Sequence, residues 1–244
     1  MKNKQTALGV IRRAVENYGM IKPGDRIAVG VSGGKDSTAL LWLLSELSHF
    51  GDYDFGLEAV TVDPSFSDVT GKDADYSALS SFCERIGVRH TVIKTKIASI
   101  VFEARNEGSP CSLCSRLRRG ALNDAAEALG CGVLALGHHM DDAAETFMMN
   151  LLLGGKVACF SPVTEYEKVR LIRPLIYMRE REIAPLCRAF SLPVAEKVCP
   201  EDGATERERM KKTLRSLDRD YRGVYKAVVG ALERGGIDGW KSRG

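Results

Sequence analysis

The sequence has 244 residues, 44% of them hydrophobic, which is enough for the core of one α/β domain with an appendage or of two small domains. No apolar run approaches the roughly 20 residues that cross a bilayer, and the N-terminus lacks the apolar segment of a signal peptide, so we expect a cytoplasmic protein without a membrane partner. The formal net charge of +3 permits a nucleic-acid partner but does not require one.

Apolar runs alternate with amphipathic segments along the chain, a spacing typical of βαβ units and of a mostly parallel sheet. The expected fold class is therefore α/β, with a doubly wound, mostly parallel five-stranded sheet and helical additions at the N- and C-terminal ends. Predicted strands cover residues 27–29, 57–62, 88–95, 132–136 and 169–172. Predicted helices cover residues 6–18, 38–51, 72–86, 97–104, 111–129, 143–153, 179–190, 205–217 and 221–233, and a loose tail is expected from residue 235.

A loop of small residues, Gly30–Ser37 (GVSGGKDS), lies between the first predicted strand and its helix. Its backbone N–H groups, the positive end of the helix dipole, the serine hydroxyls and Lys35 favour an anion, and the expected ligand is phosphate. The loop is not a P-loop, because Val29 stands at the first glycine position and Asp36 follows the lysine. It is not a Rossmann loop either, because Ser32 replaces the second glycine.

Two further strand ends are expected to place polar residues beside this loop. In a doubly wound sheet, ligands bind where the carboxyl ends of the strands meet. We therefore expect Val62 and Asp63, at the end of the second strand, to border an adenosine pocket. The fourth strand leads into Gly137–Asp142 (GHHMDD), where His138 is expected to contact the nucleotide or to act as a general base.

Carboxylates beside a phosphate site make chemical sense when a magnesium ion bridges them to the phosphate oxygens. The candidates are Asp36, Asp141 and Asp142. Asp141 and Asp142 also stand at the start of a predicted helix, where a carboxylate can cap backbone N–H groups. Capping is therefore the alternative role for both.

The seven cysteines favour free thiols, metal ligands or redox cysteines over disulfides, because no export signal is expected. Cys111 and Cys114 form a C-x-x-C pair at a helix start, where the dipole and neighbouring arginines are expected to lower the thiol pKa values. A cluster needs a third ligand. Cys199, in a polar loop before a proline, is preferred, and Cys159 is the alternative. The other cysteines fit core positions: Cys83, Cys131 and Cys187.

Basic residues follow the C-x-x-C pair, and a charged segment near the C-terminus adds a second basic group. Both groups are candidate RNA contacts. A charged helix is, however, most often a solvated face with i,i+4 ion pairs, and an aromatic content of 7% does not indicate base stacking. The residues are Arg116, Arg118, Arg119, Arg207, Arg209, Lys211, Lys212 and Arg215.

Five motifs occur together in the chain: Ser32–Ser37 (SGGKDS), Cys111–Gly120 (CSLCSRLRRG), Gly137–Asp142 (GHHMDD), Leu153–Lys156 (LGGK) and Arg173–Glu180 (RPLIYMRE). Over roughly residues 26–199 the chain resembles the tRNA 2-thiocytidine synthetase (tRNA-cytidine 2-sulfurtransferase) family of the pyrophosphate-loop (PP-loop, N-type) ATPases. The resemblance implies an adenine nucleotide alpha hydrolase-like fold in four segments. These are an N-terminal helix (1–24), a PP-loop ATPase domain (25–178), a C-terminal helical extension with the third cluster cysteine (179–234) and a tail (235–244).

The resemblance also implies ATP-dependent tRNA thiolation. ATP would adenylate the C2 oxygen of an anticodon-loop cytidine, and sulfur from a cysteine desulfurase or free sulfide would replace that oxygen and displace AMP. Implied cofactors besides ATP are Mg²⁺ and a [4Fe-4S] cluster with three cysteine ligands, Cys111, Cys114 and Cys199, and one open iron that carries the sulfur. The implied catalytic residues are Cys111, Cys114, Asp141 and Lys35. The implied ATP-binding residues are Ser32, Gly33, Gly34, Lys35, Asp36, Ser37, Val62, Asp63, His138 and Asp142.

Other functions stay open from the sequence alone. A lysidine synthetase-like ligase would have no use for the C-x-x-C pair, whereas a cluster-dependent thiolase or desulfurase of another base would share most of the ligands. A persulfide sulfurtransferase using Cys111 and Cys114, or a non-catalytic, metal-stabilised RNA-binding module, would also fit. The sequence does not identify the tRNA substrates or the oligomeric state, and a homodimer is compatible with it.

Overall fold

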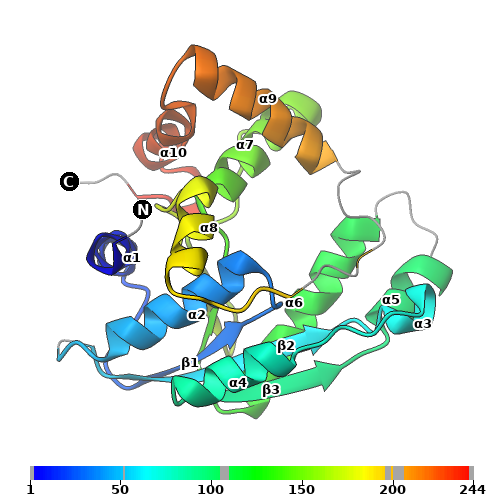
Figure 1. The fold of residues 1–244 in the computed structure, drawn as a ribbon. Coiled ribbons are helices and arrows are strands. Elements are labelled where there is room, and N and C mark those ends of the chain that lie inside the picture. Colours follow the sequence, from blue (N-terminus) through cyan, green and yellow to red (C-terminus); the bar gives the residue numbers. More distant parts are fainter. Residues whose placement is uncertain (1–2, 52, 105–109, 196–198, 200–205, 242–244) are drawn as a thin grey trace.

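The computed structural model describes residues 3–51, 53–104, 110–195, 199 and 206–241 (Figure 1). Over these residues the strands form a sheet in the order β3-β2-β1-β4-β6-β5. Neighbouring strands are parallel except for the antiparallel β5–β6 pair. The strands are β1 (Asp25–Gly30), β2 (Phe55–Asp63), β3 (Arg89–Lys94), β4 (Val133–Ala135), β5 (Val163–Glu165) and β6 (Arg170–Ile172).

The predicted α/β class and mostly parallel sheet are confirmed, but the described part of the chain contains a sixth strand, β5, that we did not predict. β5 is three residues long and none of its residues is fully buried. So short a segment shows no recognisable apolar alternation in the sequence. It pairs with β6 at the edge of the sheet, next to the strand that the sequence did predict.

The helices connect and cover these strands. They are α1 (Lys4–Tyr18), α2 (Lys35–Ser48), α3 (Ser67–Thr70), α4 (Ser77–Arg85), α5 (Ile97–Ser99), α6 (Pro110–Ala128), α7 (Met140–Gly154), α8 (Glu180–Ala189), α9 (Glu206–Asp220) and α10 (Val224–Gly235). A π-helical turn (Ile100–Ala104) follows α5, and a 3-10 turn (Ile237–Gly239) follows α10. Among the described helices, none is both long enough and apolar enough to cross a membrane.

Four helices, α2, α4, α7 and α10, begin three or more residues away from the predicted positions. Side-chain hydrogen bonds accompany the starts of α4 and α7. α4 begins at Ser77 instead of residue 72, and the Asp75 carboxylate accepts a hydrogen bond from the Ser77 N–H at 2.8 Å. α7 begins at Met140 instead of residue 143, because His139 and Asp142 form a reciprocal capping box. The polar GHHMDD motif therefore forms the loop after β4 and the first turn of α7.

The helices cover both faces of the sheet. α1, α2, α4 and α8 contribute to the larger hydrophobic core, in which α2 is buried on nearly all sides. α6 covers the opposite face, where Ala126 packs with Leu134 of β4, whereas Val133 and Ala135 on either side of Leu134 face the larger core. α7, α9 and α10 form a helical layer on the far side of α1 and α8 from the sheet (Figure 1).

We expected a loose tail from residue 235, and this prediction is wrong for the residues up to Trp240. Trp240 is 1% exposed, and its Nε1–H donates to the Phe160 carbonyl at 2.9 Å. Its ring meets the Tyr18 ring edge-on, and the Tyr18 hydroxyl donates to Glu233, which also accepts a hydrogen bond from Tyr177. The N-terminal helix and the C-terminal helix α10 are thus joined in one core.

The strand order reverses between β1 and β4, which are neighbours in the sheet although other strands separate them along the chain. Such a switch point leaves a crevice at the carboxyl ends of the strands, where ligands bind. The loops after the two strands approach each other closely here. A Cβ atom on Gly137 would lie 3.0 Å from the Ser37 backbone nitrogen and 3.1 Å from the Asp36 carbonyl carbon, so only glycine fits at this position.

Gly137→Ala should therefore force these two loops apart. We expect it to lower the free energy of unfolding by about 1–3 kcal/mol, the usual cost of overpacking a tight contact, seen as a lower urea midpoint. Gly132→Ala is the matched control, because nothing lies within 4 Å of a Cβ atom added there. Equal midpoints for the two variants would show that the loops separate without cost.

Candidate active site

A cavity of about 410 Å³ lies at the carboxyl end of the sheet. The PP-loop (Gly30–Ser37), the end of β2, the start of α6, the loop after β4 and Cys199 line it. Of the residues predicted to bind ATP or a metal, those that line the cavity are Ser32, Asp36, Ser37, Val62, His138, Cys111, Cys114 and Cys199. One cavity therefore brings together the phosphate-binding loop and all three predicted cluster ligands.

The PP-loop owes its shape to hydrogen bonds of its serines and to a glycine. The Ser37 hydroxyl donates to the Gly34 carbonyl at 3.0 Å and accepts a hydrogen bond from the Ser32 N–H at 3.1 Å. Gly33 has a φ of +77°, a left-handed conformation that residues with side chains disfavour. Helix α2 begins directly after the loop at Lys35, so the positive end of its dipole adjoins the cavity. This arrangement favours an anion.

Lys35 and Asp36 place opposite charges at the base of the loop. The Lys35 ammonium lies 2.9 Å from Asp36 Oδ2 and 3.1 Å from a Glu180 carboxylate oxygen. Burial opposes the charged form of Lys35, but hydrogen bonds to Asp36 and Glu180 outweigh burial and raise its pKa. The other Asp36 oxygen, Oδ1, is buried and accepts no hydrogen bond. His139 Nε2 lies 3.8 Å from this oxygen. A buried carboxylate oxygen that accepts no hydrogen bond beside a phosphate-binding loop fits a magnesium ion.

The cavity wall at His138 is positively charged. Burial lowers the pKa of His138 well below its usual range, and Arg173 and Arg119 add to this shift, so the imidazole is neutral near pH 7. Arg173 is 2% exposed, its guanidinium lies 4.9 Å from the centre of the Phe160 ring, and no described carboxylate pairs with it. Burial, and next Arg119, lower the pKa of Arg173 to about 10. A cationic wall without a carboxylate partner attracts anions.

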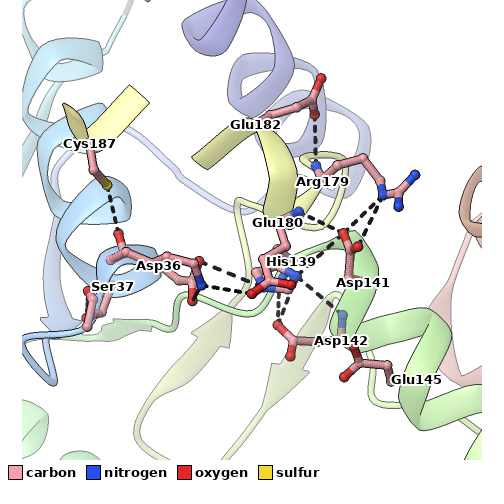
Figure 2. A network of polar contacts seen from close by, with 12 residues as sticks. Asp36, Ser37, His139, Asp141, Asp142, Glu145, Arg179, Glu180, Glu182 and Cys187 are labelled. Atoms are coloured by element: carbon pink, nitrogen blue, oxygen red, sulfur yellow. Dashed lines mark hydrogen bonds and ion pairs between the residues drawn. The ribbon is translucent and has the colours of Figure 1, made fainter. Parts of the chain in front are cut away.

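Asp141 and Asp142 do not line the cavity. Figure 2 shows both beside His139 at the start of α7. Asp141 is 5% exposed, and its carboxylate accepts hydrogen bonds from Arg179 Nε at 3.1 Å and from the Glu180 N–H at 2.8 Å. Asp142 accepts a hydrogen bond from the His139 N–H and lies 3.6 Å from an Arg207 nitrogen. Asp142 therefore caps its own helix, α7, which is the alternative role considered from the sequence. Asp141 instead holds the start of α8.

The remaining predicted ATP-binding residues lie near the cavity rather than in its lining. Gly33, Gly34 and Lys35 belong to the PP-loop and the first turn of α2. Asp63 is 7% exposed at the end of β2, and its carboxylate accepts a hydrogen bond from the Ser65 N–H at 2.9 Å. Val62 alone of the two β2 residues borders the cavity.

The cysteines are all free of disulfides, and they differ in burial. Cys111 is exposed, whereas Cys114 and Cys199 are half-buried. Burial raises the pKa of Cys114, and the charge of Arg118 only partly opposes this shift. The expected lowering of this thiol pKa is therefore wrong, because burial outweighs the arginines. Cys159 does not line the cavity, and its thiol donates to the Ala143 carbonyl at 3.5 Å.

The three cavity cysteines fit a ligand larger than a single ion. In the part of the chain that the structure describes, no three His, Cys, Asp or Glu side chains are close enough together to hold one metal ion. Cysteine thiolates are, however, the usual ligands of iron–sulfur clusters. A cluster is larger than a single metal ion, so its thiolate ligands lie farther from one another than the ligands of one ion do. The shared cavity and the donor set of Cys111, Cys114 and Cys199 therefore suit a cluster.

The sequence analysis did not identify two residues of the RPLIYMRE motif as site residues. Arg173 follows β6 and lies beside His138, and Glu180 begins α8 and contacts Lys35. The available signals were an arginine at the end of a predicted strand and an acidic residue at a predicted helix start. Neither signal identifies the partner, because the partner comes from another part of the sequence.

Comparisons with known proteins agree with this geometry. Residues 6–217 match the PP-loop domain family. The chain is 39% identical over 227 residues to the tRNA-cytidine(32) 2-sulfurtransferase of Geobacter sulfurreducens, and the match covers 91% of this chain and 86% of that protein. The corresponding protein of Pelobacter propionicus is 38% identical over 91% of this chain and 82% of its own.

Solved structures give the same result for the fold. The chain is similar to the U34-tRNA thiolase NcsA from Methanococcus maripaludis with its [4Fe-4S] cluster, with a TM-score of 0.77 and 25% identity over 95% of this chain and 79% of that one. NMN synthetase from Francisella tularensis shares the fold alone, with a TM-score of 0.52 and 13% identity over 98% and 95% of the two chains. The domain match and the relatives extend over most of the sequence, and the matched domain includes the PP-loop, the C-x-x-C pair and Cys199. The chain therefore belongs to the tRNA-cytidine 2-sulfurtransferase family of the PP-loop proteins.

Proposed function

We propose that this protein is an ATP-dependent tRNA thiolase that replaces the C2 oxygen of a cytidine with sulfur to give 2-thiocytidine. The observation that carries the proposal is the single cavity lined by the PP-loop and by Cys111, Cys114 and Cys199. Relatives named tRNA-cytidine(32) 2-sulfurtransferase support cytidine 32 as the target. The similar thiolase structure with a [4Fe-4S] cluster supports a cluster on the three cysteines.

The PP-loop is proposed to bind the phosphates of ATP. The hydroxyls of Ser32 and Ser37, the N–H groups at the start of α2 and the Lys35 ammonium supply the donors. Asp36, whose Oδ1 accepts no hydrogen bond, would hold Mg²⁺ against the phosphate oxygens, and Val62 would border the adenosine. When bound, the metal ion stabilises the negative charge of the leaving pyrophosphate.

The first chemical step is adenylation of the base. The C2 oxygen of cytidine attacks the α-phosphorus of ATP, and the bond between that phosphorus and pyrophosphate breaks. Arg119 and the buried charge of Arg173 stabilise the negative charge that develops there. His138, neutral and in the same wall, is available as a hydrogen-bond acceptor or general base. Sulfur then bonds to C2, and the C2–O bond breaks with release of AMP.

Cys111, Cys114 and Cys199 would be the three ligands of a [4Fe-4S] cluster. When bound, such a cluster would supply one iron without a protein ligand, able to take sulfide from solution or sulfide released by a thiol reductant from the persulfide of a cysteine desulfurase. The exposure of Cys111 leaves that side of the cysteine set accessible to the sulfur donor. Because one cavity holds the PP-loop and these thiols, the adenylated base need not leave the cavity between the two steps.

For the tRNA, the arginines of α6 are better placed than the charged helix α9. Arg118 and Arg119 line the cavity. Arg207, Lys211 and Arg215 of α9 instead pair with carboxylates of α7 and α8. We therefore assign the first RNA contact to α6, and we assign residues 25–178 as the ATPase domain with residues 1–24 and 179–234 as helical additions to it.

Expression of the chain in a bacterial strain that lacks 2-thiocytidine should restore this nucleoside. Mass spectrometry of digested tRNA measures it directly. Cys114→Ser should give none, because it removes a proposed cluster ligand, whereas Cys131→Ala, buried in the second core, should give the wild-type level. A different thiolated nucleoside would contradict the base assignment, and no thiolated nucleoside at all would contradict the thiolase proposal.

Anaerobically purified protein should be brown and contain about four irons and four sulfides per chain, as expected for one [4Fe-4S] cluster. Cys199→Ala should lose the visible absorbance and most of the iron, because it removes the third ligand. Cys187→Ala and Cys159→Ala should retain both, because neither cysteine lines the cavity. One zinc per chain without visible absorbance would contradict the cluster, and iron retained in Cys199→Ala would contradict the choice of the third ligand.

A further inference from the structure

Glu180 connects the PP-loop to helix α9. It is the first residue of α8, and its backbone N–H donates to Asp141 at 2.8 Å. Its carboxylate lies 3.1 Å from the Lys35 ammonium of α2, 2.8 Å from the Lys211 ammonium and 3.4 Å from an Arg215 nitrogen, the last two on α9 (Figure 2 shows Glu180 next to Asp141). One carboxylate is therefore shared by three cations from two elements.

The charge of Glu180 is fixed by these partners. Burial alone would raise its pKa, but hydrogen bonds from Lys211 and Lys35 lower it to about 2, so the side chain is ionised at any physiological pH. Lys35, which is proposed to bind phosphate, is directed at the carboxylates of Asp36 and Glu180 in this structure. The ammonium has three N–H donors, of which two contact Asp36 and Glu180. A phosphate at the loop adds a further anion around one ammonium, so it attracts Lys35 away from Glu180.

The described residues on either side of Cys199 contact the PP-loop and Glu180. Before Cys199, the Ala195 N–H donates to the Gly33 carbonyl of the PP-loop at 2.9 Å, and a Cβ atom on Gly33 would lie 2.9 Å from Ala195 Cβ. After Cys199 along the chain, helix α9 starts at Glu206 and is held by Glu180. Both the PP-loop and α9 thus lie on described contacts close to Cys199 in the sequence.

We propose that Glu180 is a positioning residue that couples nucleotide binding at the PP-loop to the placement of α9. The inference rests on the proposed function insofar as the nucleotide is ATP. When Lys35 turns to the phosphates, Glu180 retains ion pairs only with Lys211 and Arg215 of α9. The strength of the ion pairs that hold α9 against α8 then changes. Coupling of this kind is reciprocal, so a change of the α9 contacts also changes the affinity for ATP.

The test is the affinity for a non-hydrolysable Mg–ATP analogue, measured by calorimetry on the full-length protein. Glu180→Gln should bind about threefold to tenfold more tightly, because Lys35 no longer has to leave a carboxylate. Lys211→Gln should bind about threefold more weakly, because Glu180 then holds Lys35 more strongly. In the Glu180→Gln background, Lys211→Gln should have no effect. Arg209→Gln is the matched control, because Arg209 is ion-paired with Glu206 of the same helix.

These affinities separate the proposal from its alternatives. If Lys211→Gln weakens binding equally with and without Glu180, the lysine acts on the nucleotide through its own charge and the proposal is overturned. Equal affinities of the wild type and Glu180→Gln would overturn it as well, while leaving the proposed function intact. A wild-type chain that does not bind the nucleotide would overturn the proposed function together with this proposal.

Hydrogen exchange tests the structural half of the coupling. Adding the analogue to the wild type should change the exchange of peptides of α9 (Glu206–Asp220), with peptides of α10 (Val224–Gly235) as the internal reference. In Glu180→Gln saturated with the analogue, that change should be reduced at least twofold relative to the wild type. An unaltered change in the variant would show that the nucleotide reaches this segment without Glu180 and would overturn its positioning role.

Discussion

The structure depends on a buried ion pair between the start of α7 and the start of α8. Asp141 and Arg179 are 5% and 6% exposed, and the Arg179 guanidinium also lies 3.6 Å from the centre of the Tyr225 ring of α10 and 3.6 Å from Asp218 of α9. An unpaired buried charge costs several kcal/mol, so neither member of the pair can move alone. The pair therefore fixes the loop after β4, which carries His138, against three C-terminal helices.

This constraint explains how one cavity can serve two kinds of chemistry. The nucleotide side is built from the loops after β1 and β4, which touch at Gly137 and are held by the sheet. The proposed sulfur side comprises the start of α6 and Cys199, which line the same cavity. The buried arginine Arg173 lies close enough to His138 to lower its pKa. A rigid site for ATP and a more accessible site for sulfur thus share one space.

The sequence predicted the features that depend on residues close to one another along the chain. The PP-loop and the C-x-x-C pair could be recognised because their spacing within a few residues determines their geometry, and the family and fold inferred from them are confirmed. The partners of Asp141, the contact of Glu180 with Lys35 and the burial of Trp240 could not be predicted, because each joins segments far apart in the sequence. The ligand roles of Cys199 and Asp36 remain predictions.

The exposure of Cys111 also has a consequence for the conditions under which the protein works. A site that admits a folded RNA loop cannot close fully around its own sulfur chemistry. An opening that would let the anticodon loop reach these thiols would let dioxygen reach them too, and exposed thiolates are oxidised readily. With the proposed cluster in place, repair of that cluster would then set the working lifetime of each molecule in air.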